Sequence, residues 1–131
     1  METQVRDLWP NDIGVLDTDF LTPVGILREQ ASRLGEKTKN IVEARVSTSK
    51  NGPTLIHTFT LVAPAMDNYQ YALLGVSHPA FELYPVNIQY FPTNAGLAAR
   101  AQDEFLERLG QYLSTEKTRN IIQSLIAQSQ K

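Results

Sequence analysis

The chain of 131 residues contains no cysteine, and this absence excludes several kinds of chemistry. Disulfide bonds, thiolate metal sites and cysteine nucleophiles all require that side chain. The motifs HExxH, GxGxxG and GxSxG and the phosphate-binding P-loop are also missing, so the usual signatures of zinc peptidases, nucleotide-binding proteins and serine hydrolases do not occur. We expect the protein to bind no cofactor and no metal ion.

The chain also has little net charge and no long apolar run. Twelve basic and fourteen acidic residues leave a formal net charge of −2. No Lys/Arg cluster provides the basic stripe that a nucleic-acid binder needs. No apolar run approaches the roughly 20 residues that cross a bilayer. The opening, METQVRDLWPND, is acidic and polar, unlike a secretory signal. We therefore expect a cytoplasmic protein that binds neither nucleic acid nor membranes.

What the chain does have is the composition of one globular domain. Hydrophobic residues make up 42% of it and charged residues 20%, which is ordinary for a folded protein. A chain of this length buries roughly two thirds of its unfolded surface, so its core needs no covalent or metal support. We expect residues 1–131 to form a single domain, with an extended acidic arm over 1–19 and an α+β core over 20–131.

The predicted arm combines acidic side chains with apolar ones. Its acidic residues, which face the single base Arg6, are Glu2, Asp7, Asp12, Asp17 and Asp19. Its apolar residues include Trp9, Ile13, Val15 and Leu16. Trp9 precedes a proline and is therefore disfavoured in a helix. We expect the arm to pack across the domain or onto a partner subunit, and a free tail is the alternative.

Hydrophobic periodicity predicts the elements of the core. Thr22 and Pro23 can begin a helix over 23–35 as N-cap and first helical residue, and Gly35 can help to end it. Alternating apolar and polar residues predict strands at 40–48, 54–63, 69–77 and 83–91.

Capping residues predict two further helices near the end of the chain. One would start after Thr93 or Asn94 and the other after Ser114 or Thr115. The predicted fold class is α+β: an antiparallel four-stranded β-meander with one N-terminal and two C-terminal helices packed mainly on one face, in the order α-β-β-β-β-α-α. Pro85 near the start of the fourth strand favours an edge position for it.

The first two strands predict a hairpin whose register sorts polar from apolar side chains. Asn51-Gly52 is a favoured centre for a tight turn. Centred there, the hairpin pairs Val46 with His57, Ala44 with Phe59 and Val42 with Leu61. One face is then almost entirely apolar, and a one-residue slip would destroy this sorting. Pro53 has no N–H, so the innermost turn bond would be missing.

The opposite, polar face of the sheet is the first candidate for an interaction surface. It carries Glu43, Arg45, Thr58, Thr60, Asn87 and Gln89. The parity of strand 69–77 is ambiguous, and one of the two choices adds Tyr69 and Tyr71 to this face. The candidate interaction residues are Trp9, Arg45, Thr58, Tyr71 and Asn87.

The second candidate is a group of titratable side chains, His57, His78, Glu82 and Tyr84. Here His78 could act as a general base, with Glu82 orienting it and Tyr84 as a donor at the rim. The two histidines could approach each other, and with Glu82 they could supply three metal ligands. We favour the structural interpretation, in which His57 is a core histidine and 78–85 is a proline-stiffened connection between strands.

Three hypotheses for function follow. The leading one is a small, cytosolic, non-enzymatic protein-binding or assembly module, with a homodimer as one form, that uses the polar sheet face and the arm. The alternative is a small ligand-binding protein or enzyme with a pocket between helices and sheet around His57 and His78. A third is an accessory subunit whose last helix docks on a larger protein.

Overall fold

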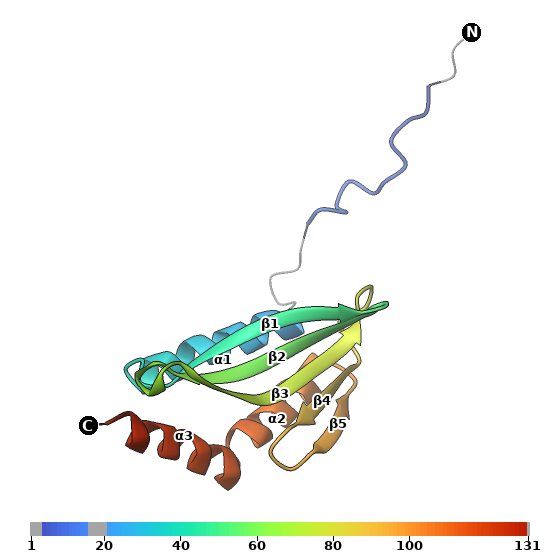
Figure 1. Ribbon diagram of the computed structural model, residues 1–131. Helices are drawn as coiled ribbons and strands as arrows, with labels where there is room; N and C mark the ends of the chain where they lie inside the picture. The colour runs from blue at the N-terminus through green and yellow to red at the C-terminus, as the bar shows by residue number, and fades with distance from the viewer. Residues whose placement is uncertain (1–3, 16–20, 131) are drawn as a thin grey trace.

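Three helices cover one face of a five-stranded antiparallel sheet in the computed structural model, which describes residues 4–15 and 21–130 (Figure 1). The helices are α1 (Pro23–Lys37), α2 (Gln102–Leu113) and α3 (Glu116–Ser129), with a short 3-10 turn, η1 (Pro64–Met66). The strands are β1 (Glu43–Asn51), β2 (Thr54–Ala63), β3 (Tyr69–Pro79), β4 (Val86–Tyr90) and β5 (Ala95–Ala99). The strands lie in chain order, so the predicted α+β meander is confirmed.

The fifth strand occupies residues that the sequence pattern assigned to a helix. The helix predicted after Thr93 or Asn94 is wrong there, because Ala95–Ala99 pairs with β4 and α2 begins only at Gln102. Asn94 has a left-handed φ of 57°, and its N–H donates to the carbonyl of Phe91 to close a turn. Such a conformation does not start a helix, and the open edge of β4 offers backbone partners to the residues that follow.

The prediction that β4 is an edge strand is also wrong, since β4 lies between β3 and β5. Pro85 immediately precedes its first residue, Val86. The missing N–H of the proline therefore lies outside the ladder and interrupts no strand pairing.

Two of the predicted helix caps are confirmed. Thr22 Oγ1 accepts from the Gly25 N–H at 3.0 Å, and Thr115 Oγ1 accepts from the Thr118 N–H at 3.1 Å. Each satisfies a backbone donor that the helix itself leaves unpaired. α1 continues past Gly35 to Lys37, so the glycine does not end it.

The β1–β2 hairpin has the predicted faces but a register shifted by two residues. Val46 pairs with Phe59 and Asn51 with Thr54, which leaves Gly52-Pro53 as the turn centre. Pro53 decides this shift: as the residue after an Asn51-Gly52 centre it could not donate the closing bond, whereas Thr54 can. Gly52 has a φ of 60°, the conformation required at the first central position of a type II′ turn. A shift of two keeps the side-chain parity, so the sorting of apolar and polar faces is confirmed.

A β-bulge at Leu73 explains the ambiguous parity of the third strand. Phe59 pairs with Leu74 but the next residue, Thr60, pairs with Ala72, so Leu73 is the extra residue in β3. Side chains before and after a bulge follow opposite parities. Tyr71 consequently pairs with Leu61 on the helix side, and the prediction that placed it on the polar face is wrong.

The core lies between the sheet and the helices, and α3 contributes to it. Leu125 is buried, and Ile121, Ile122 and Ile126 pack against the same cluster. Tyr90 of β4 joins the α2–α3 corner, where its hydroxyl bonds to Thr118 Oγ1. Thr118 Oγ1 itself donates to the carbonyl of Tyr112 at 2.9 Å. The apolar stripe of α3 therefore closes this domain's own core, which counts against the hypothesis of a free docking helix.

Candidate functional site

Two buried histidines and the exposed Thr48 form a chain of hydrogen bonds. His57 Nε2 lies 2.9 Å from His78 Nε2, and His57 Nδ1 lies 2.8 Å from Thr48 Oγ1. His78 Nδ1 lies 2.8 Å from the carbonyl oxygens of both Pro79 and Glu82. Strand pairing creates the cluster, because Thr48 lies directly opposite His57 while His78 is its diagonal neighbour on β3.

The two carbonyl groups fix the direction of every bond in this chain. A carbonyl can only accept, so His78 Nδ1 carries the proton and donates. In a neutral ring His78 Nε2 is then an acceptor, so His57 donates through Nε2. His57 Nδ1 in turn accepts from the Thr48 hydroxyl. Every ring nitrogen therefore has a partner while both rings are neutral.

Burial supports the neutral state of His57. The residues His57 and His78 are only 2% and 4% exposed. Burial lowers the pKa of His57 below its usual 6.5, and the neighbouring His78 and the more distant Arg28 lower that pKa further. A buried and fully bonded histidine pair has the properties of a structural element rather than of a general base that exchanges protons with a substrate.

The other two residues of the predicted titratable group are not aimed at the histidines. The Glu82 side chain is exposed, and only its main-chain carbonyl reaches His78. The Tyr84 hydroxyl donates to the carbonyl of Leu21 at 3.1 Å, and burial raises the pKa of Tyr84. Gln102 Oε1 accepts from the N–H of Leu21 at 3.0 Å. Tyr84 and Gln102 thus hold the chain where it enters the core. Over residues 4–15 and 21–130, no group of three potential metal ligands is found.

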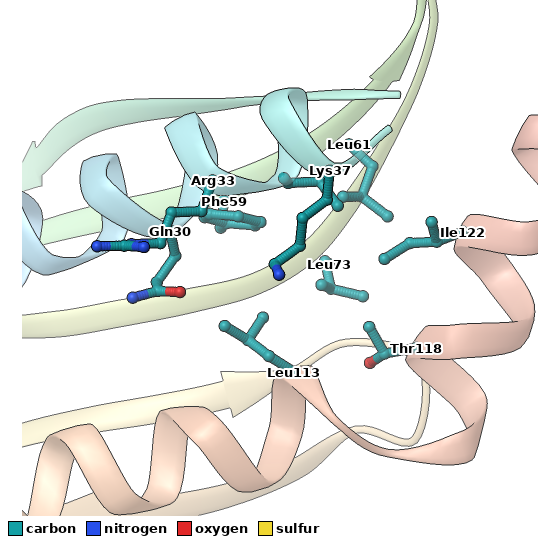
Figure 2. Close-up of a pocket in the computed structure, with 10 residues that line it drawn as sticks. Gln30, Arg33, Lys37, Phe59, Leu61, Leu73, Leu113, Thr118 and Ile122 are labelled. Atoms are coloured by element: carbon teal, nitrogen blue, oxygen red, sulfur yellow. The ribbon is translucent and has the colours of Figure 1, made fainter. Parts of the chain in front are cut away.

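An apolar groove lies between α1 and the α2–α3 corner (Figure 2). Its floor is formed by three core side chains of the sheet, Phe59, Leu61 and Leu73. Its far wall is formed by Leu113, Thr118 and Ile122. The cavity measures about 200 Å³ and is open to solvent on one side. This is smaller than the roughly 300–1,000 Å³ of typical small-molecule pockets. The groove has room for one large side chain.

The α1 rim of the groove is polar and cationic. Gln30, Arg33 and Lys37 follow one another at helical spacing and so share one stripe of α1. Figure 2 shows the Lys37 side chain extending from α1 over the hollow. Arg33 pairs with Glu29 at 3.1 Å, with both side chains 60% exposed, whereas no described acidic group lies within ion-pair distance of Lys37. A ligand with an apolar group and a nearby negative charge would match this rim.

Among the residues that the structure describes, exposed large apolar side chains are most concentrated in the N-terminal arm. Five of them are between 65% and 83% exposed: Val5, Leu8, Trp9, Ile13 and Val15. The backbone from Pro10 to Val15 forms successive turns, in which Ile13 N–H donates to Pro10 and Val15 N–H to Asp12. Trp9 N–H donates to Asp7 Oδ1 at 3.0 Å. In Figure 1 the described part of the arm extends away from the sheet and helices.

The predicted polar sheet face exists and is not covered by the three helices. Arg45, Thr58 and Asn87 all point to this side, because cross-strand pairing gives them the same parity. Phe91 folds over Gly75 at its centre, where a methyl group would lie only 3.2 Å from the ring. The face therefore remains a candidate surface without Tyr71.

No helix of residues 4–15 or 21–130 combines the length and apolarity that a bilayer crossing requires.

The groove is the feature that sequence reasoning missed. The only local signal was the basic residues of the first helix, which resemble an ordinary solvated helix end. The floor and far wall come from β2, β3, α2 and α3, so no short stretch of sequence contains them. Comparison of the chain with protein-family models, with curated proteins and with solved structures gives no match.

Proposed function

We propose that this chain is a cytosolic protein-binding or assembly module rather than an enzyme. The observation that carries the proposal is the arm, where five large apolar side chains lie within eleven residues and are mostly exposed. Removing apolar surface from water stabilises a protein by roughly 25 cal/mol per Å², and an exposed apolar side chain lacks this stabilisation. Clustered exposed apolar groups mark interaction sites, and tryptophan is among the residues that contribute most to binding.

A second surface is available on the polar sheet face. Arg45 and Asn87 are exposed there, with Thr58 between them in the sheet. Such a face suits a polar rim of contacts that sets orientation, while the apolar residues of the arm supply most of the affinity. We therefore propose separate roles for these two groups of candidate residues.

The alternative function, catalysis or ligand binding around the histidines, has less support. His57 and His78 use all four ring nitrogens within the protein. A substrate would have to displace one of these bonds before either ring could act as a base. We therefore propose a structural role for the pair.

The proposal is tested with the full chain by light scattering after size exclusion and by capture of partners from cytosol. We expect a mass above that of one chain, or a captured protein, and loss of either when Trp9→Ser and Ile13→Ser are combined. Phe81→Ser is the matched control, because Phe81 is 78% exposed but lies outside the arm. A monomer that captures nothing, with a tryptophan emission typical of water, would contradict the proposal.

A further inference from the structure

We propose that the groove between α1 and the α2–α3 corner receives Trp9 from the arm of a second copy of this chain, so that two copies exchange arms. This inference rests on the proposed function, since it names the partner and the seat of the same arm. Exchange of identical arms places each tryptophan in the other copy's groove and closes a twofold dimer.

Size and polarity match between arm and groove. The cavity of about 200 Å³ has an apolar floor and room for a single bulky side chain. Trp9 is the only tryptophan of the chain and is 71% exposed on the arm. Its indole is large, rigid and mostly apolar, which makes it suited to a small open cavity of this kind.

Charge is complementary as well. Residues 1–19 contain five acidic residues and one basic residue, whereas residues 23–39 contain four basic and two acidic ones. Asp7 and Asp12 flank Trp9 in the sequence, and Lys37 and Arg33 line the rim of the groove. A seated Trp9 would therefore bring carboxylates toward the α1 cations, and an indole beside Lys37 gains a cation–π contact.

The described part of the arm lies away from its own domain (Figure 1). The backbone hydrogen bonds recorded for residues 4–15 stay within the arm. Residues 4–15 extend away from the core, while the groove lies along the later turns of α1 (Figures 1 and 2). At roughly 3.3 Å per extended residue the arm is also long enough to reach its own groove. The experiment must therefore distinguish docking of the arm in its own groove from docking in the groove of a second copy.

Cysteine cross-linking can distinguish these two modes of docking, because the natural chain has no thiol. One chain carries Ile13→Cys on the arm and a second, differently tagged chain carries Gln30→Cys on the groove rim. A short bismaleimide should join them into a covalent heterodimer. The matched control replaces Gln30→Cys by Gln111→Cys, which is exposed on α2 and belongs neither to the groove lining nor to the polar sheet face. We expect at least about tenfold more heterodimer from the first pair, because docking raises the effective concentration of the two thiols toward the millimolar range.

The doubly substituted chain, with Ile13→Cys and Gln30→Cys together, tests the chain's own groove. A cross-link confined to monomers would overturn the exchange, and so would equal yields from the rim and control pairs. If light scattering still shows a dimer in that case, the proposed function stands and only the groove assignment fails. A monomer that captures no partner and gives no cross-link would contradict both the proposed function and the groove assignment.

Charge reversal provides an independent check. Lys37→Glu should weaken the dimer by a few-fold, and adding Asp12→Lys to the same chain should restore it, because each interface then regains an opposite pair. Both positions are exposed, so neither change threatens folding. Equal affinities for the three chains would contradict the seat that we assign to the arm.

Discussion

At the scale of single residues, the histidine pair shows how two backbone carbonyls can set the tautomers of two neighbouring neutral rings. Pro79 and Glu82 accept from His78, which makes its other nitrogen an acceptor for His57. Buried polar groups are tolerated when their hydrogen bonds are complete. Because burial favours the neutral form of His57, the stability of the protein should depend on pH.

The first prediction concerns this pH dependence. The lowered pKa of His57 means that the unfolded chain takes up a proton near pH 6.5, which the folded chain accepts only at lower pH. The free energy of unfolding should therefore be highest above about pH 6.5 and decrease as the pH falls toward the folded pKa. The slope should not exceed about 1.4 kcal/mol per pH unit, which is the limit for one proton.

Urea unfolding between about pH 5.5 and 7.5 measures this slope, since most carboxylates are ionised throughout that range. His57→Gln keeps a donor toward His78 but does not titrate. That chain should be less stable and should lose the part of the slope that His57 contributes. An identical slope in both proteins would show that His57 is not the responsible group.

At the scale of elements, single residues decide where strands turn and where helices meet. Pro53 moves the centre of the β1–β2 hairpin by one position, and the bulge at Leu73 reverses the parity of β3. Tyr90 ties β4 to the corner between α2 and α3 through Thr118. The turn, the bulge and the hydrogen bond can each be altered by a single substitution.

A second prediction compares two glycines with opposite roles. Gly52→Ala should destabilise the protein by about 1–2 kcal/mol, because an L-residue is strained at its φ of 60°. Gly110→Ala should instead stabilise it by up to about 1 kcal/mol, because Gly110 lies in α2 with open space where a methyl group would be. Thermal or urea unfolding gives both signs, and changes in the same direction would contradict these assignments.

A third prediction concerns the α2–α3 corner. Tyr90→Phe removes the hydroxyl that donates to Thr118 and should reduce the free energy of unfolding by about 0.5–1.5 kcal/mol. The loss should appear first as faster amide exchange at the start of α3. Tyr69→Phe is the control, since that side chain is 47% exposed, and it should leave both measurements almost unchanged.

At the scale of the whole molecule, the distribution of apolar surface is uneven. The sheet and three helices enclose an apolar core, whereas five apolar side chains in the described part of the arm are mostly exposed. The rim of the groove and the arm also carry opposite charge. A free chain of this kind is expected to gain stability by associating, and the association should have an electrostatic component.

The fourth prediction concerns the electrostatic component of the association. Raising the ionic strength from about 0.05 to 0.5 M shortens the screening length well below 10 Å and should weaken the exchanged dimer. Sedimentation measures its dissociation constant, and Lys37→Glu should make that constant less sensitive to salt. A dimer that becomes tighter in salt would indicate an interface governed by apolar contacts alone.

The sequence by itself determined the features that depend on neighbours along the chain. Thr22 and Thr115 cap helices because their hydroxyls reach backbone groups three residues away. The alternation in β1 and β2 sorts polar from apolar faces whatever the register, since a shift of two preserves parity. These signals were sufficient to predict the fold class and the polar sheet face.

Only the tertiary structure decided the features that join distant segments. The strand at Ala95–Ala99 depends on the edge of β4, and the place of Tyr71 depends on a bulge in its pairing with β2. The histidine pair and the groove likewise combine residues from several elements. Local patterns report which face of an element is apolar, but not what packs against it, because that depends on contacts between residues far apart in the sequence.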